Sequence, residues 1–228
     1  MGHSQTRLIP SLSLFFLGFF LSLLIDHLMQ THGVGGPTPG PYTGSDTQHS
    51  PLNAFHRHSQ PAQIYSKTIA KTPPWLPLSF GLLGVIVGHV VPRIDAILKI
   101  RRRVSRSAAV RLVGGVLGIN YAASKIKWEN NGNANAAIAL LSLGIWFLFD
   151  RTIHGCILSI LFAFIGTTFT LWFVSHGIYH FETPDLWGLR AWFPAILFLS
   201  SVCFGAVGRL MIDLDIKTTD GTETQKVS

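Results

Sequence analysis

Long stretches without a charged residue alternate with short polar segments along this chain. Five of these stretches contain 18 to 30 residues each, namely 8–25, 72–92, 130–149, 152–181 and 191–208. A helix that crosses a bilayer needs roughly 20 consecutive, mostly apolar residues, so each stretch predicts one membrane-spanning helix. A sixth stretch, 112–124, is shorter. It reaches a spanning length if the helix begins near Ser107 and Arg111 extends its charged end toward the membrane surface.

We therefore predict an all-α polytopic membrane protein that folds as a compact six-transmembrane-helix bundle. The helices are expected over residues 8–28, 75–98, 107–124, 134–149, 155–177 and 191–212. The organisation follows as an N-terminus with the first helix (1–28), a flexible connection rich in Gly, Pro and His (29–73), a core of five helices (74–212) and a polar tail (213–228). Two G-x-x-x-G spacings, at 84–88 and 114–118, are typical of close helix packing in membranes.

Composition and charge agree with a membrane protein and give it an orientation. The chain is 48% hydrophobic and only 13% charged, against about 25% charged residues in soluble domains. With a cytosolic N-terminus, twelve of its eighteen Lys and Arg residues fall on the cytosolic side, so we predict that both termini are cytosolic. No basic stretch is interleaved with aromatic residues, so we expect no nucleic-acid partner despite the net charge of +7.

The sequence contains no catalytic motif. A metal site and a transporter or lipid-carrier function remain as two weaker alternatives. There is no G-x-S-x-G, Walker or H-E-x-x-H pattern, so we predict that the protein is not an enzyme. His176 and His180, with Glu182 close behind, have a spacing that could hold a metal, but interfacial histidines fit a membrane boundary equally well. A small transporter or lipid carrier would instead use ionisable residues inside helices, here Asp26, His27 and His89.

The segment LGIWFLFDRT (143–152) ends an apolar run on an acid and a base, Asp150 and Arg151. A carboxylate at the end of a membrane helix is often a solvated boundary charge, paired here with its neighbour. The alternative is that the acid contacts a partner membrane protein where the helix ends at the cytosol. Composition alone does not distinguish these two interpretations.

Several ordered segments carry a resemblance to a known family. They are WLPLSFGLLGVIVGHVVPRIDAIL (75–98), GINYAASKIKWENN (118–131), LSLGIWFLFDRTIHG (141–155), YHFETPDLWGLRAWFPAILF (179–198) and GAVGRLM (205–211). Together they resemble the insulin-induced gene (Insig) proteins. The resemblance implies a six-helix protein of the endoplasmic reticulum membrane that binds oxysterols and holds two sterol-sensing-domain partners. These are Scap, which escorts the membrane-bound sterol-regulatory transcription factor, and HMG-CoA reductase, whose degradation the family promotes.

The resemblance also implies roles for particular residues. Asp150, with Arg151 beside it, matches the aspartate that family members need for partner binding. Four positions match residues that touch sterol in the family: Val116, Asn133, Ala137 and Trp146. Val116 stands where a phenylalanine is usual and Ala137 where a threonine is usual, so the sterol preference is expected to differ. An oxysterol is rigid and apolar with a hydroxyl at each end, and it calls for an apolar cleft with few polar anchors.

The function that we expect is oxysterol-dependent regulation of sterol synthesis from the endoplasmic reticulum membrane. The protein would retain Scap-type complexes, control HMG-CoA reductase degradation, or do both. The oxysterol is a regulatory ligand, and we expect no cofactor. A small membrane transporter or lipid carrier is the alternative.

Overall fold

A computed structural model describes residues 5–32, 35–37, 75–100, 102–125, 131–181 and 184–226. In these residues the chain forms six helices: α1 (Gln5–Thr31), α3 (Trp75–Ile97), α4 (Arg106–Lys125), α5 (Asn131–Phe149), α6 (Ile153–Ser175) and α7 (Phe193–Lys226). The predicted helices are confirmed, although α7 continues well past residue 212. Two short strands, β1 (Gly35–Pro37) and β2 (Tyr179–Phe181), pair antiparallel; the sequence pattern did not predict them. Most of the connection 29–73 lies outside the described residues.

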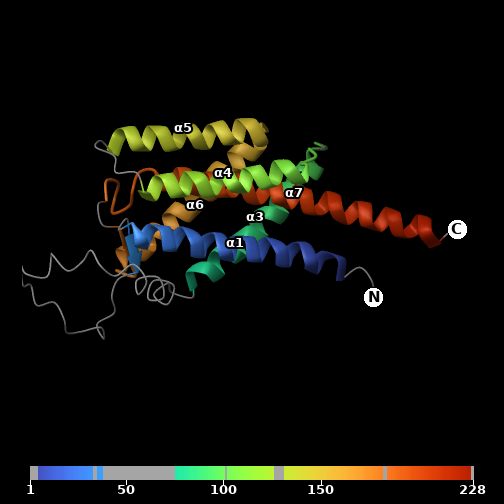
Figure 1. Cartoon of the computed structure of the whole chain (residues 1–228), viewed down its shortest axis with the longest axis horizontal. Coiled ribbons are helices and arrows are strands. Elements are labelled where there is room, and N and C mark those ends of the chain that lie inside the picture. Colours follow the sequence, from blue (N-terminus) through green and yellow to red (C-terminus); the bar gives the residue numbers. More distant parts are fainter. Residues whose placement is uncertain are drawn as a thin grey trace, which may run out of the picture.

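Helix α7 is the centre of the bundle. It contacts each of the other five helices described above, and α1 and α3 pack against each other beside it. In Figure 1 the N- and C-termini lie at the same end of the molecule, and the C-terminal part of α7 projects beyond the bundle. In the apolar part of α7 78% of the residues are buried, against 17% for α5 and 11% for α6. The outer faces of α5 and α6 are therefore free for lipid or a partner.

Five of the six helices are long and apolar enough to cross a membrane. They are α1, α3, α5, α6 and the first part of α7, while α4 is not among them. Lipid cannot satisfy polar groups, and the threonines of the exposed helix α6 bond to their own backbone. The hydroxyls of Thr167, Thr168 and Thr170 donate to carbonyl oxygens one turn earlier at 2.7–2.9 Å. The chain is a multi-pass helical membrane protein; a sixth crossing by α4 and cytosolic termini stay predictions.

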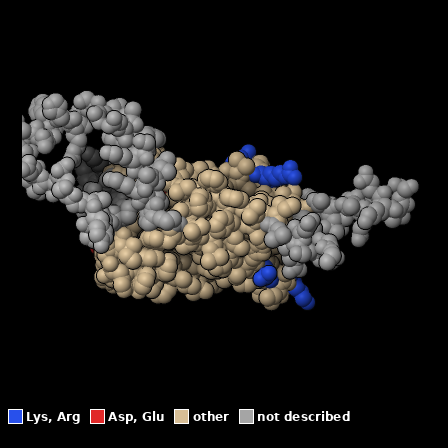
Figure 2. Space-filling view, turned by 90° about the horizontal axis from the view of Figure 1, so that it is seen from below, with Lys and Arg blue, Asp and Glu red and all other residues tan. Residues whose placement is uncertain are grey.

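Basic side chains gather at one end of the bundle. Figure 2 shows Lys and Arg at the end toward which the C-terminus of α7 points, and a long middle zone on this face without charged residues. Lys99, Arg102 and Arg103 are exposed there, and they share a surface hollow with Asp95 and Arg209. A charge-free zone on this face next to a basic end is what a bilayer-embedded bundle requires.

The two G-x-x-x-G spacings have different surroundings. The 84–88 motif lies where helices touch: a Cβ added to Gly84 would come within 2.9 Å of the Leu14 carbonyl oxygen, and one added to Gly208 of α7 would clash with the backbone of Gly88. Small residues therefore set the spacing of α1, α3 and α7, as predicted. In the 114–118 motif a Cβ on Gly114 or Gly118 would meet no atom of the described residues within 4 Å. The expected packing role is wrong for that motif.

This difference gives a testable prediction. Gly208→Ala is expected to lower the free energy of unfolding by roughly 3 kcal/mol, because the new methyl group forces α3 and α7 apart. Gly118→Ala is the matched control, and it should be neutral or stabilise by up to about 1 kcal/mol through helix propensity. Thermal unfolding of the detergent-solubilised variants measures both. Equal behaviour of the two variants would contradict the packing described here.

Candidate functional site: a buried charge network at the α5–α6 turn

A sharp turn of three residues joins α5 to α6. Arg151 has a φ of 54°, in the left-handed region, and the backbone N–H groups of Asp150 and Arg151 both donate to the Trp146 carbonyl, at 2.8 and 2.9 Å. Thr152 precedes the first turn of α6 without capping it; its hydroxyl instead donates to Asp150 Oδ1 at 2.8 Å. A side chain at position 155 would collide with Asp150 and Thr152. Gly155 is thus needed for this turn to close.

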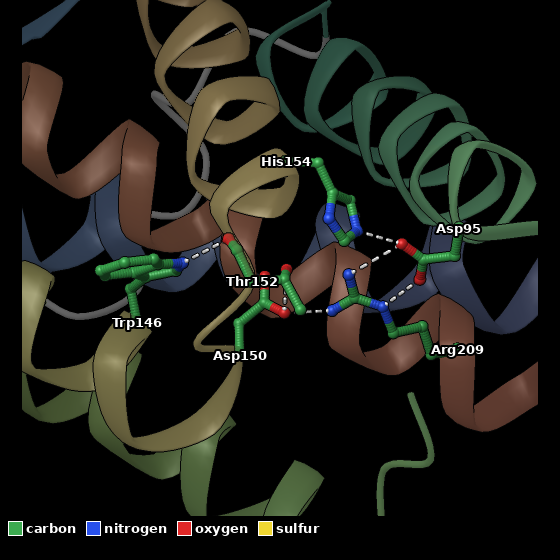
Figure 3. Close-up of polar contacts among 6 residues, drawn as sticks. All are labelled: Asp95, Trp146, Asp150, Thr152, His154 and Arg209. Atoms are coloured by element: carbon green, nitrogen blue, oxygen red, sulfur yellow. Dashed lines mark hydrogen bonds and ion pairs between the residues drawn. The ribbon is translucent and has the colours of Figure 1, made fainter. Parts of the chain in front are cut away.

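The Asp150 carboxylate points from this turn into the bundle, where it meets Arg209 of α7 (Figure 3). It is only 2% exposed, and Arg209 Nη1 donates to its Oδ1 at 2.6 Å. The same guanidinium reaches Asp95 of α3 with two further bonds, from Nε at 2.6 Å and from Nη2 at 3.3 Å. His154 of α6 is hydrogen-bonded through Nε2 to Asp95. The network therefore links α3, α6, α7 and the α5–α6 turn.

Charge balance makes Arg209 the central member of the network. Two carboxylates face a single guanidinium, and Arg209 itself is 5% exposed. An arginine stays protonated in proteins and can serve two carboxylates with its planar fork of donors. Buried ions are tolerated only with such partners, and loss of one partner is strongly destabilising. The arrangement holds the α5–α6 turn in one conformation relative to α3 and α7.

Arg151 points away from the network. Its side chain is exposed, and its guanidinium carbon lies 4.9 Å from the centre of the Phe147 ring, a cation–π geometry. Asp150 therefore pairs with Arg209 of a distant helix, whereas the boundary-charge interpretation paired it with Arg151. The sequence analysis missed Asp95, His154 and Arg209. Charged residues within apolar helices were the available signal, since such residues normally pair with one another.

A profile of the insulin-induced protein (INSIG) family matches residues 9–212. The chain belongs to the INSIG family. It is 35% identical over 144 residues to the insulin-induced gene 1 protein of Xenopus tropicalis, an alignment that covers 62% of this chain and 57% of that protein. The human insulin-induced gene 1 protein is also 35% identical over 144 residues, with 62% and 52% covered. The chain spans about half the length of the curated relatives it matches.

A solved structure of the same family shares the fold. The mycobacterial Insig homologue MvINS from Mycobacterium vanbaalenii superposes with a TM-score of 0.70 at 16% sequence identity, covering 89% of this chain and 94% of that chain. A cross-linked trimer of MvINS gives a TM-score of 0.71 with the same coverage. The two likenesses support the helical membrane bundle described above.

The candidate sterol residue on α4 lies in the interior of this INSIG bundle. Val116 is 0% exposed, and its carbonyl accepts a bond from Asn120 Nδ2 at 2.8 Å. Gly114 and Gly118, each two residues away and so about 200° around the helix, are exposed and face open space. Val116 therefore faces away from the exposed side of α4 on which these two glycines lie.

The three candidates on α5 lie on different sides of that helix. Asn133 is exposed, Ala137 is half-buried, and the two follow each other by one turn. Trp146 comes about two and a half turns after Ala137, on the opposite flank, and its indole Nε1 donates to the Thr152 carbonyl at 3.3 Å. The structure does not bring the four candidates together in one cleft, and their sterol role stays a prediction.

The metal alternative has little support in the described part of the chain. His176 Nδ1 lies 2.8 Å from the Trp172 carbonyl oxygen, and both His176 and His180 are exposed. Glu182 lies outside the described residues. No group of three metal-ligating side chains occurs within the described ranges. Cys156 and Cys203 are both free thiols in the described residues.

Proposed function

We propose that this INSIG-family chain is an oxysterol-responsive regulator of sterol synthesis in the endoplasmic reticulum membrane. Its partners would be Scap-type escort proteins, HMG-CoA reductase, or both. Support comes from the family match over 9–212 and from relatives named insulin-induced gene 1 protein. The observation that carries the proposal is the network that fixes Asp150, the residue expected to be needed for partner binding.

In this proposal Asp150 does not contact the partner itself. It promotes partner binding because it fixes the conformation of the α5–α6 turn. Its carboxylate is enclosed by Arg209 and Thr152, so a partner meets the neighbouring exposed groups instead. Arg151 and Phe147 are exposed beside it, and the apolar outer faces of α5 and α6 continue the surface into the membrane. A sterol-sensing membrane protein would lie against these faces, with Arg151 as the polar contact at the cytosolic boundary.

The sterol would lie along α4 and α5, on the exposed side of α4 that carries Gly114 and Gly118. Gly114 and Gly118 leave room for a flat apolar ring system beside the α4 backbone, and the exposed amide of Asn133 can bond one sterol hydroxyl. Ala137 lines the same side of α5, one turn away. Because coupling requires differential affinity, the sterol strengthens partner capture only if it binds the complex more tightly than the free protein.

Binding of labelled 25-hydroxycholesterol to the purified, detergent-solubilised protein tests this proposal. We expect saturable binding that unlabelled cholesterol does not displace. Ala137→Phe should weaken binding about tenfold or more, because the ring fills the space beside Asn133. Ala136→Phe is the matched control, since Ala136 is exposed on another side of α5, and it should bind normally. An absence of saturable binding, or equal effects of the two variants, would contradict the sterol site.

A further inference from the structure

A second candidate site lies at the end of the bundle opposite the Asp150 network. It is a pocket of about 560 Å³, including its open mouth, between α1, α3 and α6, closed by Tyr179 of β2 and Phe193 of α7. Most of its wall is apolar: Ile25, Met29, Trp75, Phe80, Phe173 and Phe193. Trp75 of α3 stacks on Phe173 of α6 with ring centres 4.1 Å apart. It shares no residue with the proposed oxysterol site on α4 and α5.

One side of this apolar pocket is polar and preorganised. Asp26 of α1 is 2% exposed. Gln30 Nε2 donates to its Oδ2 at 2.6 Å, and the Tyr179 hydroxyl donates to its Oδ1 at 3.4 Å. Burial, followed by the charge of Asp26 and the hydrogen bond to it, raises the pKa of Tyr179 above its ordinary range. The phenol is therefore a neutral donor that holds the carboxylate at the pocket wall.

Beside this carboxylate lies a hydroxyl group that has no hydrogen-bond partner among the described residues. Ser22 lies one helical turn before Asp26, lines the pocket and is 2% exposed. Its Oγ has no hydrogen-bond partner in the part of the chain that the structure describes. A buried polar atom left unsatisfied is costly and calls for an explanation. Helical serines commonly donate to a carbonyl one turn earlier, as Ser200 does in α7 at 2.9 Å, but Ser22 does not.

We propose that this pocket binds a neutral amphiphile that carries a hydroxyl group on an apolar body. The ligand hydroxyl donates to the Asp26 carboxylate and accepts from Ser22 Oγ, while the apolar body packs against the aromatic wall. An anionic head group would be repelled by Asp26. An ammonium group only donates, so it would leave the Ser22 proton without an acceptor. Both a single-chain alcohol and a sterol have the required chemistry, and competition distinguishes them.

Photolabelling of the full-length protein in lipid nanodiscs tests the site. The probe is hexadecanol with a diazirine in its chain, and labelled peptides are mapped by mass spectrometry. We expect labels on pocket residues of α1, α3 and α6, with competition by excess hexadecanol and not by hexadecane. Labels confined to the outer faces of α5 and α6, or equal competition by hexadecane, would overturn the proposal. Competition by cholesterol as well would identify a sterol as the natural ligand, and its failure would identify a single-chain lipid.

Variants make the test specific to the Ser22 hydroxyl. Ser22→Ala is expected to weaken hexadecanol competition roughly fivefold to tenfold, the effect of one hydrogen bond. Ser201→Ala is the matched control: Ser201 is also buried without a hydrogen-bond partner in the described structure, yet it does not line this pocket. Thr170→Phe, on the α6 wall, should abolish labelling by filling the pocket. The same competition in Ser22→Ala and Ser201→Ala, or full labelling of Thr170→Phe, would overturn the site while leaving the oxysterol proposal intact.

Discussion

Replacement of Arg209 with methionine is expected to destabilise the protein by roughly 3–5 kcal/mol, the usual effect of leaving a buried charge without its partner. Methionine has a similar length and suits the apolar interior, so the loss is one of charge rather than of volume. Asp95 and Asp150, which are 5% and 2% exposed, would then lose the guanidinium that they share. For a chain of this size the loss corresponds to a fall of about 10 °C in unfolding temperature.

The relative effects of the other network residues follow from the same contacts. Asp150→Asn should be milder than Arg209→Met, because Arg209 keeps its two bonds to Asp95. A triple variant with Asp95→Asn, Asp150→Asn and Arg209→Met removes all three charges and should recover much of the stability lost by Arg209→Met alone. Arg93→Met, at an exposed position of α3, is the surface control. If Arg209→Met unfolds at the same temperature as this control, the network does not stabilise the fold.

The fold could be predicted from the sequence because few backbone conformations are stable inside a lipid bilayer. Every backbone N–H and C=O inside a bilayer must be bonded within the protein, so long charge-free stretches become helices. The six predicted helices therefore appear close to their expected positions. The α7 extension to Lys226 was not predicted, because its residues are polar and an apolar pattern gives no signal there. The β1–β2 pair was missed because each strand has three residues, too few for an alternating pattern.

Only part of the site could be predicted, because a sequence shows which residues are ionisable but not which of them pair in the fold. Asp150 was singled out since it ends an apolar run, while Asp95 and Arg209 appeared only inside segments that carried the family resemblance. Their pairing depends on how α3 and α7 pack, and close contact of Gly88 with Gly208 brings the two helices together. A family resemblance can assign a role to a residue, but it does not show how the residues around it are arranged. Val116 illustrates this, because it is fully buried and faces away from the exposed Gly114 and Gly118.

Asp150→Ala is expected to abolish capture of a sterol-sensing-domain partner while the protein stays folded. The physical reason is that Arg209 has two carboxylate partners. Without Asp150, Arg209 remains bonded to Asp95 at 2.6 Å, so no buried charge is left unpaired. The turn, however, loses its attachment to α7, and Thr152 loses the acceptor of its hydroxyl. The exposed groups beside it then no longer hold one conformation for the partner to bind.

Co-purification with tagged Scap or HMG-CoA reductase membrane domains in the presence of 25-hydroxycholesterol measures this effect, with unfolding temperature as the check on folding. Arg151→Ala distinguishes direct contact with the partner from stabilisation of the turn, because Arg151 is exposed and lies outside the network. It should weaken capture without a change in unfolding temperature, whereas Asp213→Ala, farther along α7, should leave capture intact. Normal capture by Asp150→Ala would exclude the proposed role of the network. Loss of capture in Asp150→Ala with normal capture in Arg151→Ala would place the partner contact on Phe147 and the α5–α6 faces instead.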